Sequence, residues 1–359
     1  MDNHRRNRMA FRKNGLALSL LLGCIGCASA TFAAAQLDSV TIGFSSFSGF
    51  YGPLWLAVED GVGKKYGVDL RAVYAGRIRP QQLLASGETP FVIASGSGAV
   101  TSHVLGVKDQ VIVALLSTKM GGGIFSKSEI KRPEDLKGKL IATGRPGALN
   151  DVLVRYVMTR KWGLSPDRDV KLMPIGEPPL MLQALERGVV DATSLSVPAS
   201  FLAKSRGFFE LANYDALGLT YPQHALTTLR PTIAKNPQLV ERVLKTLIES
   251  VAIFKSNKQK SFAVWRKYMR GASEEFLEDT YQHTVAGLES VPTLSVQVIA
   301  NALDMISAHY PQAKQTDRNL IVDPSFVRRI DQSGLSPPYI KNDSGAAGSI
   351  ANRLGQCQR

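Results

Sequence analysis

The strongest constraint on the fold of this chain is the alternation of short apolar runs with helical segments. The apolar runs of the first third lie at residues 40–44, 69–75, 91–95 and 110–117. Helical patterns separate them at 53–65, 79–87 and 96–106. Short continuous apolar runs are typical of strands covered on both faces, and helical crossovers are what parallel strands need. The pattern therefore predicts an α/β protein built on a parallel sheet.

The same pattern begins again near residue 120. Three consecutive glycines lie in an extended segment at 119–128, and further strands are expected at 140–144, 169–175 and 191–196. Helices are expected between them at 152–163 and 178–188, and another begins at Pro198. Two α/β lobes in one chain are the simplest interpretation.

The last third of the chain is predicted to be mostly helical. Helices are expected at 236–258, 262–269, 273–289 and 295–310. Ser273 followed by Glu274 and Glu275 is a typical helix start, because a hydroxyl caps free N–H groups and acids suit the positive end. We expect these helices to pack back on the first lobe.

The first 35 residues read as a secretory signal peptide. Basic residues between Arg5 and Lys13 precede the apolar run GLALSLLLGCIG at 15–26, and the segment closes on Ala33-Ala34-Ala35. The run is too short for a permanent span. Leu21-Leu22-Gly23-Cys24 also resembles a lipobox, so a lipid anchor at Cys24 stays open beside a soluble exported form. Either way the chain is expected in the periplasm or another extracytoplasmic space.

Cysteine usage excludes several kinds of site. Cys24 and Cys27 lie in the leader and Cys357 lies in the tail, so residues 36–340 contain no cysteine. A disulfide framework, a cysteine metal site and a cysteine nucleophile are therefore excluded from that part. The small polar residues 341–359 are expected to be a disordered tail.

No catalytic or nucleic-acid-binding pattern is found. The net charge of +13 favours anionic ligands only weakly, and no basic block is interleaved with aromatic residues. The usual nucleophile-elbow, zinc-protease and P-loop motifs are absent from the sequence. The scattered histidines, which we expect to be surface or capping residues, are His103, His224, His283 and His309. We therefore expect no metal, no cofactor and no nucleic acid.

Polar or glycine-rich loops recur where apolar strands end and helices begin. The loops are SSFSGFYG (45–52), SGSGA (95–99), STK (117–119), RPGALND (145–151) and SLSVP (194–198). In open α/β sheets ligands bind at such loops, beside helix N-termini that favour anions. For a single loop of this kind a purely structural explanation is sufficient, since small residues help a chain turn. Five loops from two lobes favour a shared cleft.

Four segments carry a resemblance to a known family. They are residues 53–70, 81–100, 133–176 and 182–198, with the runs PLWLAVEDG, DLKGK and ALERGVVDA as the most specific parts. The chain resembles extracytoplasmic solute-binding proteins of ABC importers, in the nitrate/sulfonate/taurine-type group that also contains pyrimidine-precursor binders. The likeness covers about residues 38–255. GETPF at 87–91 departs from the family pattern, which has a hydrophobic residue and Asp where this chain has Thr89-Pro90.

The resemblance implies a type II periplasmic-binding-protein fold, with two α/β lobes joined by two crossing segments. Lobe one is expected to comprise 36–120 plus 225–340, and lobe two 121–222. The crossings are expected near 119–128 and 220–230. Closure of the lobes by hinge motion would hold a solute between them.

Ligand-binding residues follow from the resemblance, loop by loop. In lobe one they are Ser45, Ser46, Phe50, Tyr51, Gly96, Ser97 and Thr118. In lobe two they are Gly147, Ala148, Asn150 and Ser196. The rings of Phe44, Phe47, Phe50 and Tyr51 could stack on a flat solute or pack under the first helix. Arg145 and Lys119 could pair with an anion or be solvated.

The function expected from the resemblance is the delivery of a small organic or anionic solute to a membrane permease, by a monomer without catalytic activity. Two alternatives stay open. One is a sensor that presents a bound solute to a membrane kinase. The other is an enzyme related to those that make a pyrimidine precursor. Those enzymes resemble proteins with a cysteine- and histidine-rich, iron-using site. The sequence does not identify the solute.

Overall fold

The strands form two separate five-stranded sheets in the computed structural model, which describes residues 37–76, 78, 80–166, 168–307 and 309–334. Sheet A has the order β2 (Val68–Tyr74), β1 (Asp38–Phe44), β3 (Phe91–Ala94), β10 (Thr220–Leu229) and β4 (Gln110–Lys119). Sheet B has the order β7 (Lys171–Pro174), β6 (Leu140–Thr143), β8 (Ala192–Leu195), β5 (Gly123–Ser126) and β9 (Phe209–Asn213). The segments predicted to be a signal peptide (1–35) and a disordered tail (341–359), with the cysteine considered for a lipid anchor, lie outside the described residues.

Each sheet contains one antiparallel strand, so the prediction of fully parallel sheets is wrong. β10 runs antiparallel to β3 and β4, and β5 runs antiparallel to β8 and β9. Both exceptions are strands that enter directly from the other sheet. The parallel pairs are β1 with β2 and β3 in sheet A, and β6 with β7 and β8 in sheet B, as the apolar runs indicated.

The carboxyl edges of the two sheets, where their parallel strands end, face each other. Only residues 120–122 separate the end of β4 from the start of β5, and the return through 214–219 joins the end of β9 to the start of β10. Because β5 and β10 are antiparallel, each begins at the edge where its neighbours end. Loops that follow the parallel strands of both sheets therefore share one region, as a ligand site requires.

The two passages between the sheets are hydrogen-bonded to each other. Asp215 Oδ1 accepts from the backbone N–H of Met120 at 3.1 Å and of Gly121 at 3.4 Å, and Tyr214 N donates to Gly122 O at 3.0 Å. The second passage, at 214–219, lies before the crossing predicted near 220–230, because residues 220–229 form β10. The polar side chains of β10 are buried between β3 and β4, and the sequence pattern did not reveal this strand.

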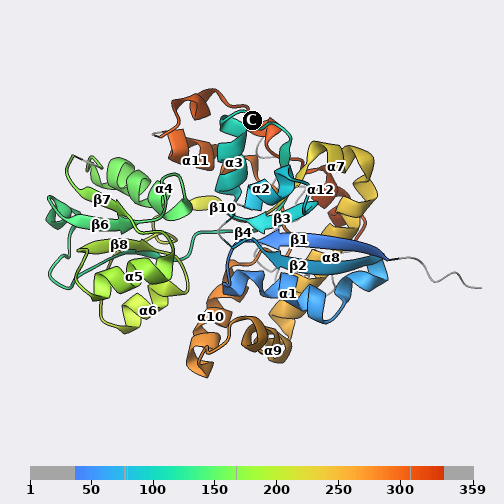
Figure 1. The fold of residues 1–359 in the computed structure, drawn as a ribbon, viewed down its shortest axis with the longest axis horizontal. Helices are drawn as coiled ribbons and strands as arrows, with labels where there is room; N and C mark the ends of the chain where they lie inside the picture. Colours follow the sequence, from blue (N-terminus) through green and yellow to red (C-terminus); the bar gives the residue numbers. More distant parts are fainter. Residues whose placement is uncertain (1–36, 77, 79, 167, 308, 335–359) are drawn as a thin grey trace, which may run out of the picture. The chain divides into compact units, whose positions relative to one another are not determined.

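Helices cover both faces of each sheet (Figure 1). Sheet B has α4 (Leu149–Tyr156) on one face and α5 (Pro178–Glu186) and α6 (Ala199–Ser205) on the other. Beside sheet A lie α1 (Gly52–Glu59), α2 (Pro80–Ala85), α3 (Gly96–Val104), α7 (Arg230–Lys235), α8 (Pro237–Ser256), α9 (Lys258–Tyr268), α10 (Glu274–Gly287), α11 (Val296–Ser307) and α12 (Ser325–Gln332). The shorter turns are η1 (Gly49–Tyr51), η2 (Val62–Tyr66), η3 (Pro133–Leu136), the π-helical η4 (Val157–Trp162), η5 (Pro311–Gln315) and η6 (Arg318–Leu320).

Alternate residues of β4 separate the two apolar cores on either side of sheet A. Val111 and Val113 join the core formed with α1, α8 and α9, whereas Ile112 joins the core formed with α3 and α11. Each fully buried side chain of this size stabilises the fold by about 1.5–3 kcal/mol. The helical last third therefore packs on the first sheet, as expected from the sequence.

Helix ends agree with the sequence signals in most places. Ser273 accepts a hydrogen bond from Phe276 N at 3.2 Å and begins α10 as expected. The first helix is shorter than the predicted 53–65, because Gly61 takes a left-handed φ of 61° and the chain continues as η2. Among the described helices, none is both long and apolar enough to cross a membrane.

Candidate functional site

The loop after β1 presents two serines beside a buried tyrosine. Ser45 Oγ shares a hydrogen bond of 2.6 Å with the Tyr51 hydroxyl, and Ser46 beside it is half-buried. Burial raises the pKa of Tyr51, and the hydrogen bond to Ser45 opposes that rise. The tyrosine therefore stays protonated at neutral pH and can orient the serine hydroxyl toward a partner.

Phe50 and Tyr51 both contact the imidazole of His224. The His224 ring stacks on Phe50 with centroids 4.7 Å apart and an interplanar angle of 15°, and it meets Tyr51 edge-on at 5.2 Å. His224 is only 6% exposed, and burial lowers its pKa to about 3, so the ring is neutral. The expectation of surface or capping histidines is wrong for His224 and for His103, which is also buried.

The predicted residues Gly96 and Ser97 begin α3 at the end of β3. Ser97 Oγ lies 2.9 Å from Ser95 Oγ, and the first turn of α3 contains no acidic residue. A Cβ on Gly96 would lie 2.6 Å from the Pro222 side chain, and one on Gly98 would overlap Gln81. The glycines of this loop are thus required by packing, while the serine hydroxyls and the positive helix end remain suited to a polar ligand.

Thr118, at the end of β4, is hydrogen-bonded to the carboxylate of Glu289. Its hydroxyl donates to Glu289 Oε1 at 2.8 Å, while the neighbouring Lys119 donates to the carbonyl oxygen of Ala286 at 3.0 Å. Both contacts tie this strand end to the segment around the end of α10.

In sheet B, the loop before α4 is organised around a buried carboxylate. Asp151 Oδ2 accepts from Gly147 N at 2.9 Å, and its Oδ1 accepts from Arg155 Nε at 2.9 Å. Asp151 lies in the first turn of α4 and supplies the negative charge that the helix end favours. Ala148 is exposed and Gly147 is half-buried beside it. This helix end is therefore less suited to an anion than the start of α3.

Asn150 lies against the end of β8. It is 8% exposed, and its Oδ1 accepts from Ser194 Oγ at 3.5 Å. Ser194 also shares a hydrogen bond of 2.5 Å with the Tyr214 hydroxyl, whose pKa is raised by burial. Ser196, two residues further on, is half-buried, and its carbonyl oxygen accepts from Ser200 N at 3.1 Å.

A row of rings links the residues of the two sheets. His283 of α10 meets Phe50 edge-on at 5.7 Å and Phe201 of α6 edge-on at 5.4 Å. Phe50 belongs to η1 beside sheet A, whereas α6 covers sheet B. A Cβ on Gly121, in the first passage, would lie 2.5 Å from His283 Nε2. His283 therefore lies where the two halves and a passage meet.

The aromatic residues after β1 are mainly packing residues. Phe44, Phe50 and Tyr51 are buried, as the packing alternative requires. Phe47 is 44% exposed and contacts Tyr74, itself 47% exposed, with ring centroids 4.7 Å apart. Of the two cations considered, Arg145 is exposed and Lys119 makes the contact described above.

Several residues beside the predicted ones were missed by the sequence reasoning. They are Ser95, Ser117, Ser194, Tyr214, His224 and His283. Ser95, Ser117 and Ser194 lie inside the predicted site loops 95–99, 117–119 and 194–198, so their hydroxyls could have been found from the sequence. Tyr214 and His224 belong to the return passage and β10, where no strand was predicted. Among the described residues, no three His, Cys, Asp or Glu side chains lie close enough to hold a metal ion.

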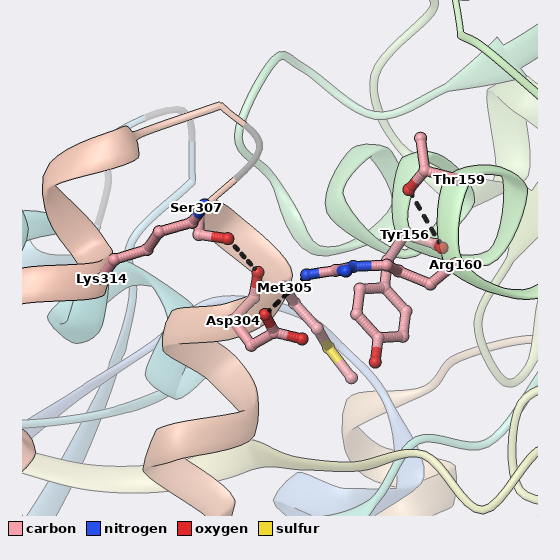
Figure 2. Close-up of a pocket in the computed structure, with 7 residues that line it drawn as sticks. All are labelled: Tyr156, Thr159, Arg160, Asp304, Met305, Ser307 and Lys314. Atoms are coloured by element: carbon pink, nitrogen blue, oxygen red, sulfur yellow. Dashed lines mark hydrogen bonds and ion pairs between the residues drawn. The ribbon is translucent and has the colours of Figure 1, made fainter.

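A surface pocket of about 370 Å³ lies away from these loops, between η4 and α11 (Figure 2). It is lined by Tyr156, Thr159, Arg160, Asp304, Met305, Ser307 and Lys314, none of which is a predicted ligand-binding residue. Arg160 reaches across it to Asp304 Oδ1 at 2.9 Å, and Ser307 donates to the Asp304 carbonyl oxygen. The polar groups of Arg160, Asp304 and Ser307 bind each other, and the side chains of Arg160 and Asp304 are about half exposed.

Comparison with known proteins fits this architecture. The model of the family described as NMT1/THI5 like matches residues 51–260, more than half of the chain. The chain belongs to the NMT1/THI5-like family. A relative from Brucella abortus (strain 2308), named "Putative binding protein", is 26% identical over 267 residues, which are 72% of this chain and 79% of the relative.

Solved structures with a similar fold include a binding protein and an enzyme. The periplasmic aliphatic sulphonate binding protein SsuA from Escherichia coli has a TM-score of 0.67 at 19% identity, covering 80% of this chain and 93% of its own. The desulfurization enzyme DSZB has a TM-score of 0.61 at 15% identity, covering 83% and 99%. The predicted periplasmic-binding-protein fold is thereby confirmed.

Proposed function

We propose that this protein is the extracytoplasmic solute-binding component of an ABC importer. It holds a small organic or anionic solute between two lobes and delivers it to a membrane permease, acting as a monomer. The proposal is carried by one observation above all: polar loops from both sheets converge where the carboxyl edges face each other. The lobes that the sequence predicts are 36–120 plus 225–340 and 121–222, and β10, which begins at Thr220 within sheet A, is assigned to lobe one in this proposal.

The solute contacts are the loop residues named above. Ser45, Ser46 and Ser97 offer hydroxyls from lobe one, and Asn150 and Ser196 offer polar groups from lobe two. An anionic end of the solute is favoured beside α3, because Asp151 already supplies a carboxylate at the start of α4. Contact with both lobes stabilises the closed form, which is the form presented to the permease.

Binding without catalysis is favoured by the partners of the serine hydroxyls. Ser45 and Ser194 are each hydrogen-bonded to a buried tyrosine, not to a histidine or carboxylate that could act as a general base. Since the desulfurization enzyme has a related fold, the fold itself does not decide this question. Incubation with sulfinates and sulfonates, followed by analysis for released sulfite, distinguishes a binding protein from an enzyme.

Solute binding is testable by thermal shift. Nitrate, taurine, longer alkanesulfonates and an aminopyrimidine form the first panel, together with solutes that co-purify with the protein and are identified by mass spectrometry. A true ligand at about 100 times its Kd stabilises the folded state by about 2.7 kcal/mol and raises the melting temperature with concentration. If neither the panel nor the co-purified solutes shift the melting temperature, the proposed function is contradicted.

Two substitutions test the assignment of the site. Ser46→Ala and Asn150→Ala should each weaken binding of the identified solute about tenfold, as expected for one lost hydrogen bond. Lys171→Ala, at an exposed position of β7, should leave the affinity unchanged. Unchanged affinity in both site variants would remove the assignment.

A further inference from the structure

His283 occupies the junction of the two lobes with one ring nitrogen unsatisfied. Its Nε2 is buried and has no hydrogen-bond partner among the described residues. Phe50 packs against the ring from the side of lobe one, and Phe201 packs against it from the side of lobe two. A buried imidazole nitrogen without a partner costs free energy that water would recover if the two sides separated.

The partners of His283, which is half-buried, distinguish it from His224, the buried histidine near the site. His224 contacts Phe50, Tyr51 and β4, all of which belong to lobe one. Separation of the lobes leaves those contacts intact. His283, in contrast, contacts Phe201 of lobe two and lies against Gly121 of the first passage, so its surroundings change when the lobes move.

The charges that face His283 do not cancel the effect of its burial. Burial lowers the pKa of His283; the carboxylate of Asp215, in the return passage, opposes this, and Lys119, at the end of β4, adds to it. Asp279 lies one turn earlier on α10 and is exposed, while Phe50, Phe201 and Gly121 bring no charge. The neutral ring is therefore the form that fits between the lobes, and a protonated ring favours hydration.

We propose that His283 is a positioning residue that couples lobe closure, and with it solute retention, to pH. His283 acts through its contacts with Phe50 and Phe201. This inference rests on the proposed function, because it requires that the lobes move. In the closed arrangement the His283 ring is neutral and packs between Phe50 and Phe201. As the pH falls below the ordinary range for histidine, the open arrangement gains a proton that the closed one resists, so the lobes separate and the solute is released.

The test measures lobe separation directly and needs no solute. The three native cysteines are replaced (C24S, C27S, C357S), and spin labels are attached at Glu88→Cys and Arg187→Cys, two exposed positions on opposite lobes. Pulsed electron paramagnetic resonance gives the distance distribution at pH 7.5 and 5.5. The population at the longer distance should rise at the lower pH by up to about tenfold, the limit set by an ordinary imidazole.

Matched variants identify the titrating group. His283→Gln and His283→Asn should remove the pH response, whereas His309→Gln, at an exposed histidine, should keep it. A distribution that does not change with pH, or one that changes equally in the His283 variants, would overturn the inference. Failure of every solute to bind would instead count against the proposed function, because the labelled distances are measured without solute.

Discussion

The first passage between the sheets should tolerate no side chain at Gly122. This residue has a φ of 95°, and a Cβ there would overlap the carbonyl oxygen of Leu195 at the end of β8. The left-handed conformation alone costs about 1–2 kcal/mol for an alanine. Displacing the Leu195 carbonyl from its place opposite Gly123 adds about 1–1.5 kcal/mol for a weakened ladder hydrogen bond. Gly122→Ala should therefore destabilise the protein by about 3 kcal/mol.

Urea denaturation followed by circular dichroism measures this cost. Gly188→Ala is the matched control, because Gly188 also has a positive φ, of 70°, but nothing lies within 4 Å of the position of its Cβ. The control should lose only the conformational part, about 1–2 kcal/mol. The difference between the two variants is the steric part, which comes from the close approach of the passage to β8.

Equal loss of stability in the two variants would refute this reasoning. It would mean that the passage can move away from β8 without cost, and that the three glycines at 121–123 reflect turn preference alone. A normal midpoint with a changed denaturant slope would point to an altered unfolded state instead.

Two other predictions concern buried ionisable groups. Burial lowers the pKa of His224 to about 3 in the folded protein, against an ordinary 6.5, so the unfolded chain takes up the proton first and stability falls as the pH drops below 6.5. Between pH 7 and pH 5 this loss of stability amounts to about 2 kcal/mol. In urea denaturation at the two pH values, His224→Gln should reduce the pH dependence of stability by that amount. Asp151→Asn should cost about 1.5–3 kcal/mol in the same assay, because the carboxylate binds Gly147 N and Arg155, whereas Asp304→Asn, at an exposed ion pair, should cost under about 1 kcal/mol. An unchanged pH dependence in the first case, or equal costs in the second, would contradict these assignments.

Most of the architecture could be predicted because its strands are apolar on both faces. The segments read as strands at 40–44, 110–117 and 140–144 became β1, β4 and β6. β10 was missed since TYPQHALTTL contains a proline and several polar residues. Its burial between β3 and β4 comes from the rest of the sheet, and no local pattern in the segment records it.

The site could be predicted as loops but not as a hydrogen-bonded arrangement. The serines after β1 and β8 were visible in the sequence, whereas the tyrosines that hold them could not be paired with them. Tyr214 reaches Ser194 only because the return passage runs beside the end of β8. His283 is farther from its ring partners in the sequence, and only the packing of α10 against η1 and α6 brings them together.

A crystal structure with the identified solute would show whether both lobes hold it. The solute should touch the Ser45–Ser46 loop of one lobe and the Gly147–Asn150 loop of the other at the same time. A solute held by one lobe alone, or bound in the pocket between η4 and α11, would contradict the proposed site.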